Sequence, residues 1–179
     1  MNSGAPSASS LGTADGVRAV NADLDEQLVR GARRLDPDRL FEFEEVAANQ
    51  EAWNAAMLLA HAGEFPRFFA DEIRRFVADA SAPIGRTHQD PQRLAAVSDV
   101  RGARDVLVQD MEAAMQELAA ALTLLQNVHL SAPTNNRRYG VEPLSAFLDR
   151  YVLAHKHGHI TQLAGMPASP PPTSHVDLL

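Results

Sequence analysis

Residues 144–163 read LSAFLDRYVLAHKHGHITQL, and the fold can be worked out from this stretch. Apolar residues recur at spacings of three and four, which is the pattern of one face of an α-helix. They are Leu144, Phe147, Leu148, Tyr151 and Val152. Steps of four residues continue this face to His155 and then to His159, whereas His157 points away from it. The stretch therefore predicts two imidazoles one helical turn apart on a core-facing stripe.

Two histidines on an apolar stripe are costly, because a buried imidazole has two ring nitrogens to satisfy and a charged one is harder still to bury. A metal ion shared by the two rings would take one nitrogen from each. The same spacing is also found in hydrogen-bonded or solvated pairs that bind nothing. The pair is thus a candidate metal site that needs a further ligand elsewhere in the chain.

The bulk composition is that of one soluble domain. The chain has 179 residues, of which 45% are hydrophobic and 22% charged, enough for a single substantial core. The net charge of -7 argues against nucleic-acid binding, which needs a concentrated basic face. The densest basic cluster, Arg137 and Arg138 after two asparagines, is too short to reverse this expectation.

The absence of cysteine limits the kind of metal site. Without thiolates, any ligands must be histidines or carboxylates, which favours a divalent ion such as Zn, Ni or Fe. No secretion signal is visible in residues 1–10, and the longest apolar runs fall short of the about 18 residues that span a bilayer. We expect a cytoplasmic protein with no membrane segment.

Periodicity predicts four long helices, over residues 14–35, 51–80, 90–128 and 143–165. Gly102 marks a possible break in the third, and the aromatic residues of the 39–50 connection are expected to pack against the core. Residues 81–89 and 129–142 are interpreted as loops, because no strand-type alternation is visible. Four amphipathic helices predict an all-α four-helix bundle over residues 13–166. A flexible tail (1–12) and a proline-rich tail (167–179) flank it.

The second helix supplies a third histidine on an apolar stripe. His61 lies between Leu58 and Phe65, about ten residues or 15 Å from the predicted start of its helix. His155 and His159 lie about 15 and 9 Å from the end of theirs. If the two helices run antiparallel, all three rings reach the same level of the bundle. Alone, His61 would be interpreted as a core histidine that bonds a backbone carbonyl.

Two segments that contain these histidines resemble the signatures of the DinB/YfiT-like metalloprotein superfamily. They are LLAHAGEF (58–65) and AHKHGHITQL (154–163). In that family one histidine on the second helix and an H-x-x-x-H pair on the fourth bind a divalent metal, and a glutamine follows the pair. The matching residues here are His61, His155 and His159, with Gln162 at the glutamine position. Trp53 stands where the family often has a tryptophan.

The resemblance implies an up-down-down-up bundle, often a homodimer, with members that act as hydrolases or as thiol-dependent transferases or isomerases. Two features depart from the family pattern. Pro66 predicts a kink one turn past His61, because it lacks the N–H of a helix interior residue. The 81–89 connection is also too short to cross the length of the bundle unless the second helix is shorter than predicted.

Three neutral imidazoles on one ion leave positions open for water or a small-molecule substrate, as in catalytic rather than structural sites. Such an ion suits hydrolysis, or activation of a thiol brought by a small cofactor, since the chain has no cysteine. Glu64, Asp149 and Gln162 are candidates to orient the rings. Two other interpretations stay open. One is a non-catalytic bundle that acts through oligomerisation or partner binding, and the other is a pH-responsive switch that uses clustered histidines.

Overall fold

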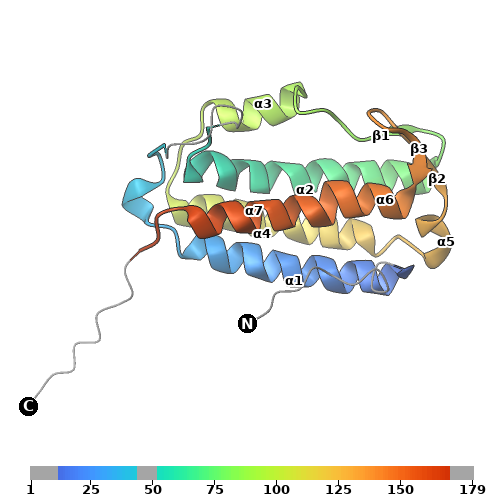
Figure 1. The fold of residues 1–179 in the computed structure, drawn as a ribbon, viewed down its shortest axis with the longest axis horizontal. Coiled ribbons are helices and arrows are strands. Elements are labelled where there is room, and N and C mark those ends of the chain that lie inside the picture. The colour runs from blue at the N-terminus through green and yellow to red at the C-terminus, as the bar shows by residue number, and fades with distance from the viewer. Residues whose placement is uncertain (1–11, 44–51, 170–179) are drawn as a thin grey trace, which may run out of the picture.

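The computed structural model describes residues 12–43 and 52–169. Four long helical segments lie side by side in it (Figure 1). They are α1 (Ala14–Arg33), α2 (Ala55–Ala78), α4 (Arg104–Leu122) and a fourth segment made of α6 (Leu144–Leu148), a π-helical turn η3 (Asp149–Leu153) and α7 (Ala154–Gly165). In Figure 1, α1 and the fourth segment run from right to left, and α2 and α4 run from left to right. The predicted four-helix bundle is confirmed.

The core between these helices is closed by large apolar side chains that come from all four segments. Leu28, Phe65, Met111 and Phe147 have no exposed surface. α2 packs along α4, and α1 contacts both α4 and α7. The helix starts follow the sequence, since Thr13 caps α1 by accepting a hydrogen bond from the Gly16 N–H. α2 continues as one helix across Pro66.

The connection from α2 to α4 explains how the chain returns along the bundle. The predicted 90–128 helix is two helices, α3 (Pro91–Ser98) and α4, with a break at Gly102. Gly102 has a φ of 125°, a conformation that L-residues with side chains rarely adopt. α3 packs on α2 and leads back toward the end where α2 starts (Figure 1). α3 and the loops beside it therefore make the crossing for which residues 81–89 alone are too short.

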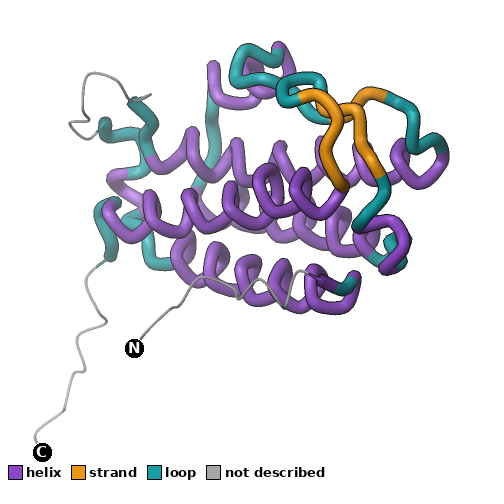
Figure 2. Tube along the Cα trace, turned by 45° about the vertical axis from the view of Figure 1, so that its right-hand side comes forward, coloured by secondary structure: helices purple, strands orange, loops and turns teal. Residues whose placement is uncertain are grey.

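A small sheet at one end of the bundle corrects the prediction of plain loops (Figure 2). β1 (Pro83–Ile84) pairs in parallel with β2 (Pro133–Asn136), which pairs antiparallel with β3 (Gly140–Pro143). A short helix, α5 (Asn127–Leu130), precedes β2. Strands of two to four residues are too short for alternation to stand out in sequence, and β1 finds its partner about fifty residues away.

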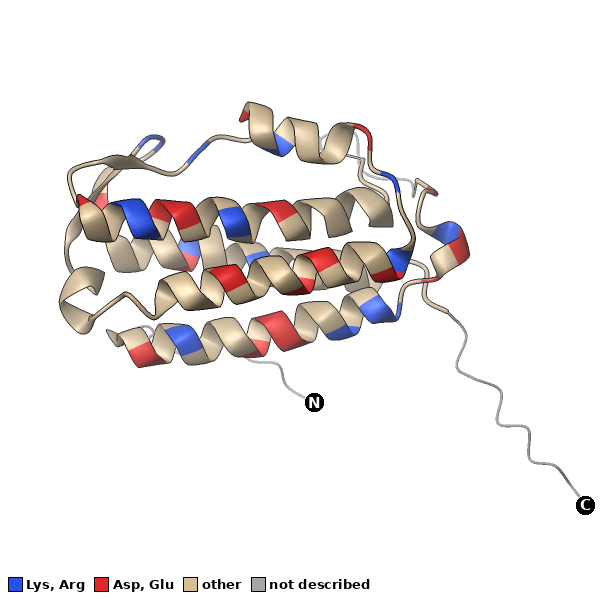
Figure 3. Cartoon of the chain, turned by 180° about the vertical axis from the view of Figure 1, so that it is seen from behind, with Lys and Arg blue, Asp and Glu red and all other residues tan. Residues whose placement is uncertain are grey.

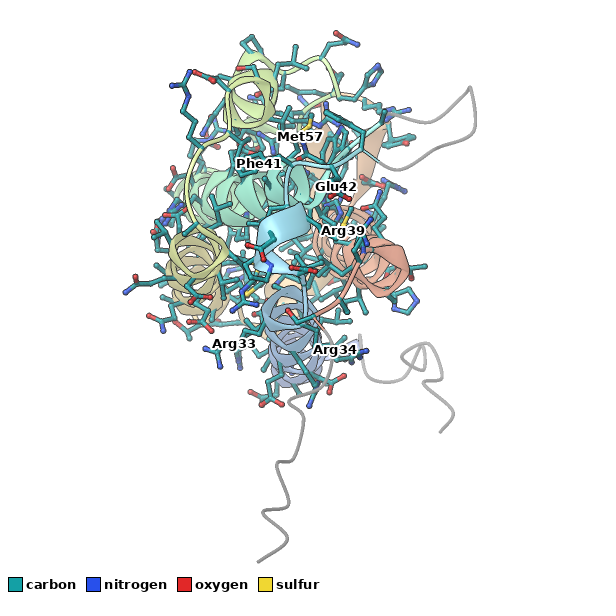
Figure 4. The ribbon with its side chains drawn as sticks, turned by 90° about the vertical axis from the view of Figure 1, so that its left-hand side faces the viewer. Arg33, Arg34, Arg39, Phe41, Glu42 and Met57 are labelled. Atoms are coloured by element: carbon teal, nitrogen blue, oxygen red, sulfur yellow. The ribbon has the colours of Figure 1, made fainter. Side chains whose placement is uncertain are left out.

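The connection after α1 also differs from expectation. It contains a 3₁₀ turn, η2 (Pro37–Arg39), followed by the buried Leu40. Phe41 and Phe43, however, are 51% and 62% exposed, so the prediction that these aromatic side chains pack against the core is wrong. Leu40 takes the core position, while Arg39 pairs with Glu42 across 2.6 Å (Figure 4). The rest of this connection, residues 44–51, lies outside the described residues.

The ends of the predicted domain are described only in part. Residues 1–11 and 170–179 lie outside the described residues. These two ranges contain His175 and most of both predicted tails. The first residues of the predicted C-terminal tail return to the end of α1, where Ala168 pairs with Leu35. Within residues 12–43 and 52–169, no helix is both long and apolar enough to cross a membrane.

Charged side chains of both signs alternate along the outer faces of the helices (Figure 3). One group ties α2 to α4, because Arg67 contacts Asp110 at 2.8 Å and Glu117 at 3.0 Å. These contacts are partly exposed, so each adds only modest stability. They link the helix that carries His61 to α4.

Candidate metal centre

The structure brings His61, His155 and His159 together from two helices. The Nε2 atom of His155 lies 3.0 Å from Nε2 of His61 and 2.9 Å from Nε2 of His159. One candidate ligand atom from each ring lies within 4.8 Å of the others. His61 and His159 are buried, and His155 is half-buried. Three imidazole nitrogens thus face one point inside the bundle.

The π-helical turn η3 lies directly before this pair of histidines. A π turn holds one more residue than an α turn, so it shifts the face that the following residues present. Val152 and Leu153 are both buried, and then Lys156 has no exposed surface. As a result, α7 directs His155 and His159 toward α2 and Lys156 toward α1. Steps of four from Leu148 and Val152 lead to Lys156, so periodicity places it on a buried stripe, and the structure adds that its ammonium meets α1.

The outer nitrogens of two rings are oriented by neighbours. Nδ1 of His159 lies 2.7 Å from Oε1 of Gln162, which accepts a hydrogen bond from the Nδ1–H and so leaves Nε2 with its lone pair. Nδ1 of His61 lies 3.5 Å from a carboxylate oxygen of Glu64, too far for a good hydrogen bond but close enough for electrostatic attraction. Two of the three predicted orienting residues therefore contact the rings. Asp149 is exposed on η3.

Glu64 is itself held by Arg86. The two guanidinium nitrogens of Arg86 lie 2.5 and 2.6 Å from the two carboxylate oxygens of Glu64, a bidentate pair. Arg86 also lies over the ring of Phe68, 4.2 Å from its centroid. No sequence pattern pointed to the role of Arg86, because it follows β1 in a stretch interpreted as a loop. Glu64, one turn after His61, was the available signal.

Aromatic side chains form the walls of the cluster. The Trp53 ring meets His61 edge-on at 5.0 Å and stacks on His159 at 6.3 Å between centroids. Phe65 meets His155 at 4.8 Å. These walls keep water away from the rings and place them in a medium of low polarity, which disfavours the charged form of histidine.

Burial lowers the pKa of all three histidines. It lowers the pKa of His61 although the nearby Glu64 acts in the opposite direction, and it lowers the pKa of His159 to about 4. The pKa of His155 lies well below its ordinary value because of burial first and then of the two neighbouring imidazoles. At neutral pH the cluster is uncharged, which is the protonation state that binds metal ions.

The three nitrogens fit a divalent ion. Tetrahedral Zn–N bonds of about 2.0–2.1 Å require nitrogens about 3.4 Å apart. The Nε2 atom of His155 lies slightly closer than this to those of His61 and His159, at 3.0 and 2.9 Å. Nδ1 of His61 is buried and makes no hydrogen bond to the described residues, so its proton is left for Glu64 to stabilise. Neutral imidazoles also suit Ni and Fe, so the donor set allows the three ions named from the sequence.

A cavity of about 180 Å³ adjoins His61 and His155. Its other lining residues include Arg86, Arg93, Arg138 and Tyr151. A larger groove of about 990 Å³ lies between α1 and α4, and its described lining contains none of the three histidines. Of these two spaces, the smaller cavity is the one that adjoins the histidine cluster. The exposed His88 also lines this cavity, and His157 is exposed on α7, as predicted.

Fold and site together define a four-helix bundle with a buried three-histidine cluster beside a small cavity. No protein-family model and no curated protein match the sequence. Among solved structures the fold is similar to that of YfiT from Bacillus subtilis, described as "a probable metal-dependent hydrolase with an unusual four-helix bundle topology". The two share 14% sequence identity and a TM-score of 0.58, over 84% of this chain and 85% of that chain. The DinB/YfiT-like fold suggested by the histidine motifs is thereby confirmed.

Proposed function

We propose that the protein binds one divalent metal ion through Nε2 of His61, His155 and His159, and that it is a metal-dependent hydrolase of a small molecule. The observation that carries the proposal is the convergence of three neutral Nε2 atoms from two helices on one buried point. A divalent ion held there would lower the pKa of water and polarise a carbonyl group.

The residues of this chain prepare that chemistry in three ways. Gln162 and the Glu64–Arg86 pair hold ring protons on the outer nitrogens, so that lone pairs point inward. Trp53 and Phe65 exclude water from the back of the cluster. The cavity beside His61 and His155 gives a substrate access from one side. An open, dry and oriented site is typical of catalytic rather than structural metal centres.

Hydrolysis is preferred to thiol transfer because it needs only water as the second reactant. A transferase would require an external small thiol, since the chain contains no cysteine. The resemblance further implies a homodimer and a cytoplasmic location, and both stay predictions. The rival interpretation, a non-catalytic bundle that acts through oligomerisation or a partner, predicts a protein without stoichiometric metal.

The ligand assignment can be tested with untagged protein and elemental analysis. After reconstitution with Zn, Ni or Fe, we expect one ion per chain in the wild type and loss of it in His155→Ala and His159→Ala, with the helical circular-dichroism signal retained. His157→Ala is the matched control, because this histidine lies on the same helix but is exposed. If both ligand variants keep a full complement of metal, the assignment is wrong.

The reaction class can be tested on the reconstituted protein with a panel of activated esters and amides. We expect hydrolysis that a chelator abolishes and that added metal restores. Metal-loaded protein that hydrolyses no member of the panel faster than the metal-free form would contradict the hydrolase proposal and leave the metal-binding proposal intact.

A further inference from the structure

The cavity beside the histidines is cationic in a chain that is acidic as a whole. Its charged lining residues are Arg86, Arg93 and Arg138, and the described lining contains no aspartate or glutamate. The whole chain has 23 acidic residues against 16 lysines and arginines. Three arginines around one small cavity are therefore a local concentration of positive charge against the overall balance.

The three arginines are not equivalent. The charge of Arg86 is neutralised by the bidentate contact with Glu64. Arg93 is 8% exposed, donates to the His88 carbonyl at 2.7 Å and lies over the Trp53 ring. Arg138 is exposed, and its guanidinium has no carboxylate partner among the described residues. Arg138 is thus the cation of the three that is available to a ligand.

The turn between β2 and β3 fixes the position of Arg138. Oδ1 of Asn136 accepts hydrogen bonds from the backbone N–H groups of Arg138 at 2.9 Å and Tyr139 at 3.3 Å. The adjacent Arg137 donates to the Gly85 carbonyl at 2.7 Å and so ties the turn to the segment that follows β1. The basic pair that is too short for nucleic-acid binding therefore has two separate roles. Arg137 holds the turn, and Arg138 lines the cavity.

Tyr151 adds a second donor to the same cavity. Its hydroxyl is buried and has no hydrogen-bond partner among the described residues. The nearby Asn136 side chain is already engaged with the turn and with Glu142. Burial raises the pKa of Tyr151, so the hydroxyl stays protonated at neutral pH and can donate a hydrogen bond. A buried donor without an acceptor is unfavourable unless a ligand or water satisfies it.

We propose that the cavity takes a small substrate that carries a carboxylate or phosphate group, held by the guanidinium of Arg138 and the hydroxyl of Tyr151. The inference rests on the proposed function, because it places the reacting bond beside His61 and His155. A sphere of 180 Å³ is about 7 Å across, so only a few bonds separate the anionic group from the reacting carbonyl. Charge-assisted hydrogen bonds are the strong ones, and a guanidinium suits planar oxyanions.

The binding step can be tested on metal-free protein by calorimetric titration with succinate and inorganic phosphate at fixed ionic strength. Succinamide, which has nearly the shape of succinate but no charge, is the ligand control. We expect at least one of the two anions to bind. If succinate binds, succinamide should bind at least tenfold more weakly. Arg138→Gln should weaken anion binding about tenfold or more. Tyr151→Phe should weaken it severalfold, with the fold verified by circular dichroism.

Arg101→Gln is the matched protein control, because it removes the same charge from an exposed arginine that pairs with the nearby Asp99. It should leave the affinity unchanged. If Arg101→Gln weakens binding as much as Arg138→Gln, the effect comes from net charge and the inference fails. It also fails if neither anion binds, or if succinate binds and succinamide binds as tightly.

A second measurement separates this inference from the proposed function. On metal-loaded protein, hydrolysis of 4-nitrophenyl acetate is compared with that of the carboxylate-bearing mono-4-nitrophenyl succinate. We expect the anionic ester to be preferred and the preference to disappear in Arg138→Gln. Equal hydrolysis of both esters would contradict the anion site and leave the hydrolase intact. Arg138-dependent anion binding without any hydrolysis would contradict the hydrolase and leave the anion site intact.

Discussion

Lys156 offers a sharp test of how α7 is held in place. Its side chain has no exposed surface, and its ammonium donates to Oδ1 of Asn21 at 2.6 Å and forms an ion pair with Asp25 on α1. Burial is the largest effect on both partners, because it lowers the pKa of Lys156 and raises that of Asp25. Each charge has therefore lost much of its hydration, and their mutual contact offsets the cost.

Lys156→Met keeps an unbranched side chain only one atom shorter but leaves the Asp25 carboxylate without its cation. Removing one partner of a buried ion pair costs about 3–5 kcal/mol, and the lower end applies because the Asp25 side chain is 16% exposed and can recover some water. Adding Asp25→Asn to Lys156→Met removes the stranded charge. We expect the double variant to recover more than half of the lost free energy of unfolding.

The assay is urea unfolding of the metal-free protein, followed by circular dichroism for the wild type, both single variants and the double variant. A cost below about 1 kcal/mol for Lys156→Met would refute the argument, since a buried ion pair cannot be broken so cheaply. So would a double variant whose loss equals the sum of the single losses, because the two residues would then not be coupled. The double variant should also still bind metal, since His155 and His159 face α2.

Two further predictions concern the histidine cluster. Glu64→Gln should weaken metal binding about 10–100-fold, because it removes the negative charge beside the outer nitrogen of His61. Competition with a chelator measures the affinity, and Asp149→Asn, at an exposed residue, is the control. The metal-free protein should lose stability as the pH falls from about 6.5 toward 4, since unfolded histidines take up protons that the buried cluster, including His159, resists. The free energy of unfolding should fall by at most about 1.4 kcal/mol per pH unit for each histidine, measured from urea unfolding midpoints. The exposed His157 should not contribute, so His157→Ala should show the same dependence of stability on pH. A midpoint that does not change between pH 5 and 8 would contradict this, and with it the pH-switch interpretation.

The histidines show how far periodicity alone reaches. Each ring was placed on an apolar stripe by spacings within its own helix, and a helical stripe must face the core to stay out of water. The level at which the stripes meet followed from residue counts and an antiparallel arrangement. Glu64 and Gln162 could be named for the same reason, because each lies one turn from a histidine on its own helix.

Other parts of the site could not be predicted in this way. Arg86 meets Glu64 across 22 residues, and Arg138 reaches the cavity through a turn held by β1, which precedes it by about fifty residues. Phe41 and Phe43, by contrast, were expected to be buried because they are aromatic, but their side chains are exposed. In each case the outcome depends on segments that approach only when the whole chain is packed.

The sequence by itself thus determined the four helices, the bundle and the three histidines, because helical periodicity and capping are local properties of the chain. Tertiary structure alone decided the small sheet, the pairing of Lys156 with Asn21 and Asp25 on α1, and the cationic lining of the cavity. The physical reason is how far apart in the sequence the interacting residues lie. A helix satisfies its own backbone, whereas strand pairs, buried ion pairs and cavity walls need partners that the sequence does not place next to one another.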